Sequence, residues 1–508
     1  MTSPRDIANR IPITGALMLA TLMNTLDSTI ANVALPHIQG SVSAAQDQIT
    51  WVLTSYIIAT AIMTPLSGWL SERFGRKRMF LLSILGFTVA SMLCGVATNL
   101  PEIVLFRLLQ GIAGASMMPL SQTVMLDIFP PQQVPRVMAL WSSAVIVGPI
   151  LGPALGGWLT DNLSWRWVFY INVPIGILAF VGLSTFMDDD AGGRQRPFDA
   201  LGFTALVAFV GGLQLMADRG PGQDWFHSPE ICAYGMTVLI GLWVFVTQVM
   251  TSKNPFFHRD LMRDRNFATS TIISFFIGGL MFSTTALLPT MMQSLMGYSV
   301  LQAGYASMPR GIGSLCAFLL IPMLMSMIGA RRVLLTGLAV SSIAVFLMTR
   351  FSLDMTSSSI MVSGVIQGFG TGMMFAPLSI LAFATLSPTH RIEGTIVNTM
   401  ARSLGSSVGI SAVQAMLVRQ SASVHSLLAG NIQPSDPVIS SALQGPLNPG
   451  IQTGLMALNG EITRQGAMVA YDWVFSSLLL ASLVIVPLLL IMRPPPPIAA
   501  PAHEMVGE

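Results

Sequence analysis

Residues 68–81 read Gly-Trp-Leu-Ser-Glu-Arg-Phe-Gly-Arg-Lys-Arg-Met-Phe-Leu, a short charged segment between two long apolar ones. The charge-free intervals on its two sides run from Asp47 to Glu72 and from Arg78 to Glu102. A helix needs about 20 mostly apolar residues to cross a bilayer, so each interval is long enough for one crossing. Two apolar spans joined by a short basic loop predict a helical membrane protein.

The composition of the whole 508-residue chain agrees with this segment, since 52% of the residues are hydrophobic and 9% are charged. A soluble domain carries about 25% charged residues, so a single water-soluble globule is excluded. The net charge of +2 gives no basic field for nucleic acid. The three cysteines, Cys94, Cys232 and Cys316, lie in apolar stretches and predict neither a disulfide framework nor a zinc cluster. No cofactor and no metal site are predicted.

Fourteen membrane spans are predicted when every interval between charges is treated in the same way. They are residues 13–35, 48–70, 79–98, 101–124, 136–160, 166–187, 199–217, 229–250, 267–290, 302–327, 332–350, 357–384, 395–419 and 471–492. An even number of crossings places both termini on one side. The loops on that side hold seventeen Lys and Arg against five on the other, so both termini are expected in the cytoplasm. Asp27 within the first span argues against a cleaved signal peptide.

The two parts of the chain repeat each other. Residues 74–81 resemble residues 328–335 at an offset of 254, and residues 110–121 resemble residues 367–379 at offsets of 256 to 258. Two matches near one diagonal predict a duplicated six-helix unit, with spans 7 and 8 inserted between the copies. Transporters built from such repeats hold the substrate near the midplane, between the two halves.

This repeat divides the chain into five predicted parts. They are a cytoplasmic N-terminus (1–12), an N-terminal six-helix bundle (13–187), two inserted helices with their loops (188–266), a C-terminal six-helix bundle (267–492) and a cytoplasmic tail (493–508).

Three motifs carry a family resemblance. Residues 68–77 resemble the loop signature of the major facilitator superfamily between helices 2 and 3. Residues 26–36, Leu-Asp-Ser-Thr-Ile-Ala-Asn-Val-Ala-Leu-Pro, resemble the first-helix motif of its fourteen-helix drug:proton antiporter branch, and residues 152–157 resemble its helix-5 antiporter motif. Two departures are Glu72, where the loop signature usually has Asp, and Ala139, where the long helix-5 motif has an early Gly.

With Trp165-Arg166-Trp167 and Asn172-Val173-Pro174, the resemblance extends to EmrB-type efflux permeases over nearly the whole chain. It implies an all-α major facilitator fold with two six-helix bundles and two inserted helices. It also implies proton-coupled multidrug export across the bacterial inner membrane, together with a periplasmic membrane-fusion adaptor and an outer-membrane channel.

Asp27 is the one acid among 23 that lies well inside a predicted span. An ionisable group at this depth costs about 2.5–3.5 kcal/mol on insertion scales and usually marks a proton or ion path. At 1.5 Å per residue, Asp27 and Arg107 lie roughly 12 and 9 Å below the outer boundary, so we expect them to meet. The resemblance implies the same proton-coupling pair. The alternative is a structural ion pair that only fixes helix packing.

Helix 5 carries a stripe of small residues. Gly148, Gly152 and Gly156 recur every four residues, with Pro149 and Pro153 between them and Gly157 after them. Glycines on one face allow a close helix approach, and prolines bend the helix. Packing alone explains the stripe, whereas the resemblance implies a hinge and seal between the halves. Residues 405–409 formally match a hydrolase G-x-S-x-G, but no strand precedes them, so small-residue packing is expected.

The resemblance also implies a conformational switch on the cytoplasmic face, formed by Gly68, Glu72, Arg73, Gly75, Arg76 and Asp127. Glu72 held against a helix N-terminus of the other half would latch one conformation. The alternative for the basic residues is a solvated, positive-inside loop.

The energy source and the substrate class follow from the few charges. Neither Lys77 nor Lys253 is followed by Ser or Thr, so the chain has no Walker A loop and is expected to use an ion gradient rather than act as an enzyme. Polar residues deep in the spans are candidates for the substrate cavity: Asn24, Gln110, Arg310, Gln367 and Arg402. Three deep Arg against one Asp favour neutral or weakly acidic amphiphiles over permanent cations, unless these arginines only brace helices.

Residues 420–470 are predicted as the long periplasmic loop, with a helix-like run at residues 455–469, and serve either as an adaptor-docking segment or as a flexible connector. Two other functions stay open. One is a proton-coupled metabolite importer or symporter on the same scaffold, and the other is a membrane receptor or scaffold without transport. The helix-5 motif argues against the importer, and the lack of a soluble signalling domain argues against the receptor.

Overall fold

The structure is a computed structural model that describes residues 8–44, 48–49, 51–130, 132–189, 197–387, 390–432, 448 and 451–492. Within these ranges all regular secondary structure is helical. The predicted tail 493–508 lies outside the described residues, as do residues 1–7 of the predicted N-terminus.

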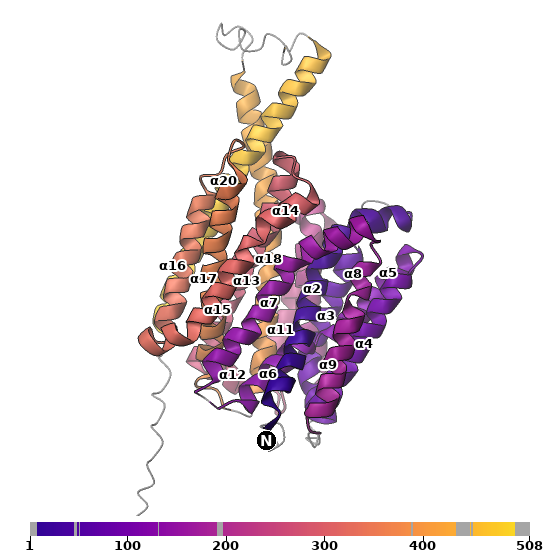
Figure 1. The fold of residues 1–508 in the computed structure, drawn as a ribbon, viewed down its shortest axis with the longest axis vertical. Coiled ribbons are helices and arrows are strands. Elements are labelled where there is room, and N and C mark those ends of the chain that lie inside the picture. The colour runs from indigo at the N-terminus through magenta and orange to yellow at the C-terminus, as the bar shows by residue number, and fades with distance from the viewer. Residues whose placement is uncertain are drawn as a thin grey trace, which may run out of the picture.

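The N-terminal half is a bundle of six spans, two of which are interrupted by a short break (Figure 1). Its elements are α2 (Arg10–Ser41), α3 (Trp51–Phe74), α4 (Arg76–Val96), α5 (Leu100–Gly114) followed by α6 (Met117–Ile128), α7 (Val134–Asn162), and α8 (Trp167–Tyr170) followed by α9 (Asn172–Phe186).

The C-terminal half repeats this arrangement. Its elements are α13 (Arg265–Leu295), α14 (Val300–Ser307) followed by α15 (Pro309–Ile328), α16 (Ala330–Met348), α17 (Ser357–Phe383), α18 (Arg391–Asn431) and α20 (Gln452–Ile491). The tight turns at Gly75 and Gly329 occupy equivalent places, with φ of 89° and 81°. Residues with a β-carbon rarely adopt such φ, which explains why both copies of the repeated loop have glycine there.

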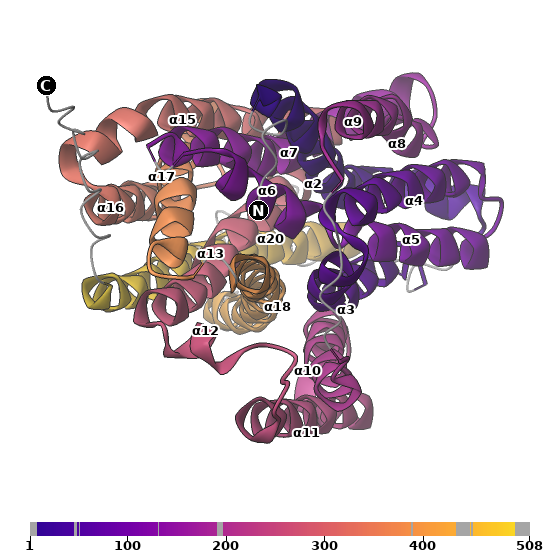
Figure 2. The same cartoon turned by 90° about the horizontal axis from the view of Figure 1, so that it is seen from below.

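Between the halves lie the inserted helices α10 (Ala200–Arg219) and α11 (Pro229–Thr251), with two 3-10 turns between them (Gly220–Gly222 and Trp225–His227) and the short α12 (Arg259–Arg263) after them. Figure 2 shows α10 and α11 outside the two bundles, with α10 next to α3. Helix α10 also packs against α18, so it contacts both halves.

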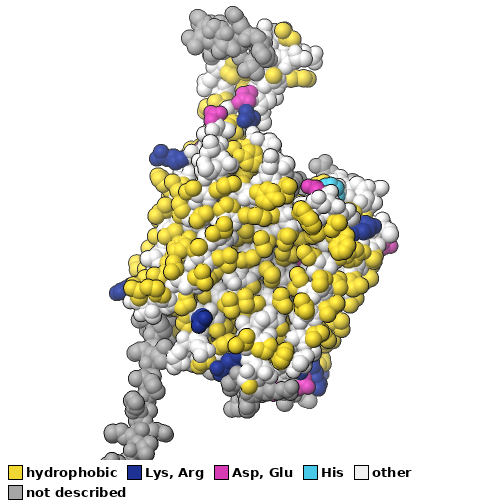
Figure 3. All heavy atoms as spheres, in the orientation of Figure 1, with side chains coloured by type: hydrophobic (Ala, Val, Ile, Leu, Met, Phe, Trp, Pro, Cys, Tyr) yellow, Lys and Arg dark blue, Asp and Glu magenta, His cyan; other side chains and the backbone are white. Residues whose placement is uncertain are grey.

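The prediction of fourteen crossings is confirmed. Twelve helices of the described chain are long and apolar enough to cross a membrane, and the more polar α2 and α18, of 32 and 41 residues, make fourteen. Hydrophobic side chains cover the middle of the face seen in Figure 3, with charged side chains toward both ends. The side where α2 begins is called here the terminal face, and the opposite side the hairpin face.

The region predicted as a long loop is mainly helical where the structure describes it. Helix α18 continues to Asn431 and α20 begins at Gln452, so both helices project from the hairpin face (Figure 1). His425 Nε2 lies 3.0 Å from Asn459 Oδ1 and joins the two helices. The helix-like run at 455–469 is confirmed, whereas a flexible connector is wrong for residues 420–431 and 452–470. The polar composition of residues 420–470 suggested a loop, but the same composition also suits a helix that extends beyond the membrane.

Candidate proton and substrate site

Asp27 lies near the middle of α2 and is fully buried. Its Oδ2 accepts a hydrogen bond from Arg107 Nη1 of α5 at 2.6 Å. Its Oδ1 accepts hydrogen bonds at 2.9 Å from Gln110 Nε2 and from Asn172 Nδ2. The structure therefore brings together the predicted pair, and three donors from α5 and α9 hold the carboxylate.

A second layer of contacts fixes Arg107, which is 1% exposed. Its Nε donates to the carbonyl oxygen of Val52 at 3.1 Å, and its guanidinium carbon lies 4.3 Å from the centroid of the Tyr56 ring. Buried ion pairs are tolerated only where such additional bonds satisfy the remaining donors. Both Asp27 and Arg107 are therefore closed off from solvent in this packing.

Asn172 and Ser91 belong to the same network, although sequence reasoning did not assign them a role. Asn172 Nδ2 also donates to Ser91 Oγ at 3.0 Å, and Ser91 Oγ donates to the carbonyl oxygen of Phe169 at 2.8 Å. The motif that begins at Asn172 was visible in the sequence. Its contact with Asp27 was not predicted, although Asn172 lies six residues into its predicted span as Arg107 does, because a neutral amide stands out less in an apolar span than a charge.

Two residues predicted for the substrate cavity, Asn24 and Gln110, make hydrogen bonds within the N-terminal half. Gln110 bonds Asp27, and its Oε1 accepts from Arg107 Nη1 at 2.8 Å. Asn24 Nδ2 donates to Tyr56 Oη at 3.3 Å and to the carbonyl oxygen of Gly114 at 3.2 Å. Both side chains therefore support the Asp27 network.

The C-terminal half holds a corresponding network without an acid. Gln367 Nε2 donates to Thr284 Oγ1 at 2.7 Å, just as Gln110 donates to Asp27. Both residues of this second pair lie 257 positions after their counterparts in the first. Arg310 Nη2 donates to Thr284 Oγ1 at 3.0 Å, and the same guanidinium bonds Gln367 Oε1 and Thr285 Oγ1. Neutral oxygens therefore bind Arg310.

Arg402 of α18 has a different environment. Its Nη2 lies 3.6 Å from Met118 Sδ of α6, in the other half, and its guanidinium carbon lies 5.4 Å from the centroid of the Phe375 ring. It is 7% exposed. In the part of the chain that the structure describes, no carboxylate pairs with it. A buried cation beside a sulfur atom and an aromatic ring, with no carboxylate partner among the described residues, suits an anionic ligand between the halves.

The glycine stripe of α7 faces α2 rather than the other half. A β-carbon at Gly148 would lie 2.8 Å from the backbone nitrogen of Leu26, and one at Gly156 would lie 2.9 Å from the carbonyl oxygen of Ile30. A β-carbon at Gly152 would meet the side chain of Thr29, and one at Gly157 would lie near the side chain of Val33. The glycines implied as a seal between the halves thus pack inside one half.

The seal across the halves comes from another side of α7. Ile150 lies against Gly311 of α15, and Ala154 lies against Gly304 of α14. Pro149 and Pro153 lie inside α7, which runs unbroken through both.

At the terminal face, Asp127 of α6 makes the ion pair that joins the halves. Its carboxylate lies 3.0 Å from Arg391 Nη1, at the start of α18, and 2.7 Å from Arg76 Nη1 in its own half. Thr123 Oγ1 and Thr395 Oγ1 lie 2.8 Å apart in the next turn. Gly68 of α3 packs against Ile396 of α18. The halves are therefore in contact at this face.

The remaining predicted switch residues surround this contact. Arg73 stacks on Trp69 of its own helix, with 5.1 Å from the guanidinium carbon to the ring centroid, and Gly75 forms the turn already described. Glu72 lines a pocket together with Asp199 and Glu393. Asp127 thus pairs with the start of α18 in the other half, and Glu72 lies beside the same first turn of α18 through this pocket.

Known proteins resemble this chain in both sequence and fold. The profile described as Major Facilitator Superfamily matches residues 17–410. The chain is 34% identical over 466 residues to the fatty acid resistance protein FarB of Neisseria gonorrhoeae, covering 91% of this chain and 92% of FarB. It is 34% identical over 477 residues to the multidrug export protein EmrB of Escherichia coli K12, covering 93% of each chain.

Two solved structures share the fold at low identity. The human organic anion transporter MFSD10 superposes with a TM-score of 0.58 at 14% identity, covering 95% of this chain and all of that one. The proton:xylose symporter XylE superposes with a TM-score of 0.59 at 16% identity, covering 94% and 95%. The family model, the full-length similarity to EmrB and FarB, and the shared fold agree. This chain belongs to the Major Facilitator Superfamily of membrane transporters.

Proposed function

We propose that this protein exports lipophilic weak acids, such as fatty acids, across the bacterial inner membrane in exchange for protons. The observation that carries the proposal is the Asp27 network, in which a fully buried carboxylate is held by Arg107, Gln110 and Asn172. A buried charge of this kind is costly and is retained in transporters where it carries protons.

Protonation of Asp27 links the proton to the conformation. It removes the negative charge 2.6 Å from Arg107, so a buried guanidinium is left with only neutral partners. An uncompensated buried charge disfavours the present packing by several kcal/mol. The protein then shifts toward a conformation in which Arg107 meets water or another acceptor, and the two halves exchange access.

The substrate class is proposed from Arg402 together with the relatives. Arg402 places a cation between α6 and α18 with no acid beside it, which suits a carboxylate or phenolate head group. The FarB relative is named for fatty acid resistance, and fatty acids are amphiphiles with such a head group. Permanent cations are disfavoured at this position.

Orientation and partners follow from the same proposal. The loops on the side of the termini hold most of the basic residues, so we place the terminal face in the cytoplasm and the hairpin face in the periplasm. The projecting ends of α18 and α20 then offer a periplasmic surface for a membrane-fusion adaptor, which in turn contacts an outer-membrane channel.

An importer is the second candidate, since the same fold also occurs in a proton:xylose symporter. The direction of transport separates the two functions. In inverted membrane vesicles energised to an acidic interior, an exporter accumulates a labelled fatty acid inside the vesicles, whereas a symporter depletes it.

The proton role is tested with Asp27→Asn and with the double variant Asp27→Asn/Arg107→Gln. The single variant leaves Arg107 unpaired and is expected to lose about 3 kcal/mol of stability, whereas the double variant regains most of it. Neither variant is expected to transport fatty acid in proteoliposomes under a pH gradient. The control is Asp161→Asn at the exposed end of α7, which should transport as the wild type does.

A purely structural ion pair predicts the opposite result. In that case the double variant, once its thermal stability is restored, would also restore transport driven by the pH gradient. Such an outcome would remove Asp27 from the proton path.

A further inference from the structure

Three metal-ligating side chains meet at the terminal face, apart from the Asp27 network. His258 precedes α12, His390 precedes α18, and Glu393 lies in the first turn of α18. One nitrogen of each ring and one carboxylate oxygen all lie within 4.8 Å of one another. Because 135 residues separate His258 from Glu393, no spacing in the sequence pointed to this group.

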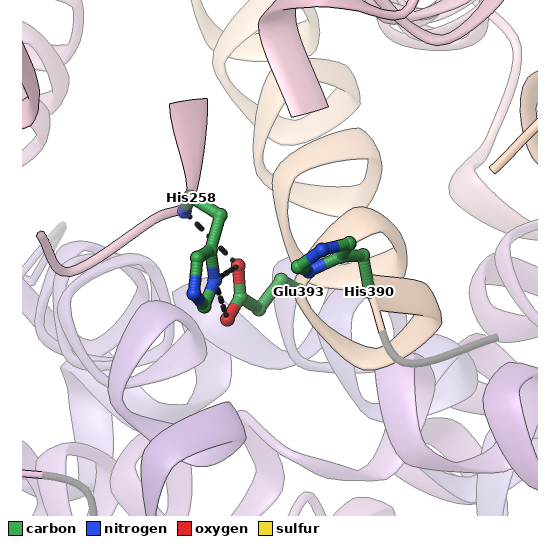
Figure 4. A group of neighbouring side chains, drawn as sticks. All are labelled: His258, His390 and Glu393. Atoms are coloured by element: carbon green, nitrogen blue, oxygen red, sulfur yellow. Dashed lines mark hydrogen bonds and ion pairs between the residues drawn. The ribbon is translucent and has the colours of Figure 1, made fainter. Parts of the chain in front are cut away.

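The Glu393 carboxylate lies between the two imidazole rings (Figure 4). His258 Nδ1 is 2.9 Å from Oε1 and 3.1 Å from Oε2, and the backbone nitrogen of His258 donates to Oε2 at 3.1 Å. The ring centroids of His258 and His390 are 4.7 Å apart. Glu393 is 6% exposed, whereas both histidines are partly exposed. The carboxylate is therefore fixed, and the rings remain accessible from the terminal face.

This geometry is close to what a zinc ion needs. Bonds of 2.0–2.2 Å to nitrogen and oxygen in a tetrahedron put neighbouring ligand atoms about 3.3 Å apart. His258 and Glu393 already have nearly this separation. No two of these ligand atoms are more than 4.8 Å apart, so a pair must close by no more than about 1.5 Å, and we expect a rotation of the partly exposed His390 to supply this shift. Two imidazoles and a carboxylate, with water in the fourth position, form a ligand set that zinc favours.

The electrostatic surroundings also favour a cation. A pocket that borders Glu393 is lined by two further acids, Glu72 and Asp199, and none of its lining residues is Lys or Arg. Arg391, two residues before Glu393 in the sequence, directs its Nη1 to Asp127.

We propose that His258, His390 and Glu393 form a binding site for a divalent transition metal of the zinc type, which holds the terminal face closed. The metal joins residues 252–258, the connector between α11 and α12, to the first turn of α18. The same turn carries Arg391, which pairs with Asp127, and Thr395, which bonds Thr123 in the other half. A metal that holds the first turn of α18 in place therefore opposes the separation of the halves at this face.

Metal binding is tested directly on the whole protein, purified without a polyhistidine tag and stripped with EDTA. Titration with zinc chloride against a fluorescent zinc indicator is expected to give one ion per protein. His258→Ala and His390→Ala are each expected to weaken binding at least tenfold. The matched controls are His37→Ala and His227→Ala, both exposed and outside the cluster, which should bind as the wild type does.

The effect on closure has its own readout, which does not depend on what the protein transports. In a background without Cys94, Cys232 and Cys316, Thr123→Cys is expected to react with a maleimide several-fold more slowly when zinc is present. His390→Ala is expected to remove this protection.

Two results would overturn the proposal. One is a wild-type protein that binds no zinc, or that binds it equally well in both His258→Ala and His390→Ala, which leaves a hydrogen-bonded pair only. The other is zinc binding at the cluster without any change in the labelling of Thr123→Cys, which would mean that the metal does not keep the terminal face closed.

Discussion

Arg310 and Arg402 show that the role of a buried arginine depends on its neighbours. Both lie deep in the C-terminal half, and sequence alone gave them the same significance. Thr284, Thr285 and Gln367 surround the guanidinium of Arg310 with oxygen acceptors. Arg402 has a thioether and an aromatic ring. We therefore expect Arg310 to brace the C-terminal network and Arg402 to be the arginine that binds an anion.

Arg402→Gln is therefore expected to raise the KM for a fatty acid about tenfold or more, because a hydrogen bond to a charged group contributes about 1.5–3 kcal/mol. Transport of the methyl ester of the same fatty acid should change little, since it has no anionic group. Arg402→Lys should recover part of the affinity, and Arg419→Gln, on the exposed part of the same helix, serves as the control. Equal losses for the acid and the ester in proteoliposomes would contradict this role.

At the scale of elements, the contact between α2 and α7 positions Asp27. Thr25 and Leu26, which directly precede it, lie against Gly148, and Thr25 Oγ1 donates to the carbonyl oxygen of Ala144 at 3.2 Å. Because the atoms closest to a β-carbon at Gly148 include the α2 backbone, we expect a larger residue there to move the helix that carries Asp27.

Gly148→Ala is expected to lower the free energy of unfolding by about 1–3 kcal/mol, as overpacking of a tight contact does. It should also reduce proton-coupled transport, since α2 shifts beside Asp27. The matched control is Gly15→Ala on α2, where a β-carbon meets nothing within 4 Å. Replacing Gly by Ala in a helix interior should stabilise that variant by roughly 0.5–1 kcal/mol. Equal thermal stabilities for the two variants in detergent would refute this assignment.

Much of this architecture could be predicted because few forces decide it. In a bilayer, apolar length fixes each crossing, and the fourteen predicted spans correspond to observed helices. The contact between Asp27 and Arg107 could also be predicted, since the depth of each residue along a straight helix is enough to place them at the same level. The role of Asn172 was not predicted, although it lies at the same predicted depth, because a neutral amide stands out less in an apolar span than a charge does. Nor was the group at Glu393, because it depends on how a connector folds back onto α18.

At the scale of the whole molecule, the two halves share a plan but differ in charge. Gln110 bonds Asp27 in one half, and Gln367 bonds Thr284 at the equivalent place in the other. Among the described residues, the N-terminal half thus holds a buried acid, Asp27, at this level, and the C-terminal half holds a buried cation, Arg402, that no described carboxylate pairs with. In the proposed mechanism, proton and substrate are coupled through the relative movement of the halves, not through direct contact.

This coupling requires the contacts at the terminal face to separate in every cycle, and a crosslink there should stop transport. Thr123 Oγ1 and Thr395 Oγ1 lie 2.8 Å apart across the halves, so Thr123→Cys/Thr395→Cys is expected to form a disulfide when oxidised. In a background with Cys94, Cys232 and Cys316 replaced by alanine, oxidation should abolish transport in proteoliposomes, and reduction should restore it.

The matched control joins two residues of one half. Ser83 and Ser116 also share a hydrogen bond between their hydroxyl groups, but both lie in the N-terminal half, which moves as one body in this mechanism. Oxidised Ser83→Cys/Ser116→Cys should therefore transport as its reduced form does. If the crosslink across the halves also left transport unchanged, alternating access through this face would be wrong, because a covalent bond between Thr123→Cys and Thr395→Cys cannot stretch to open a path.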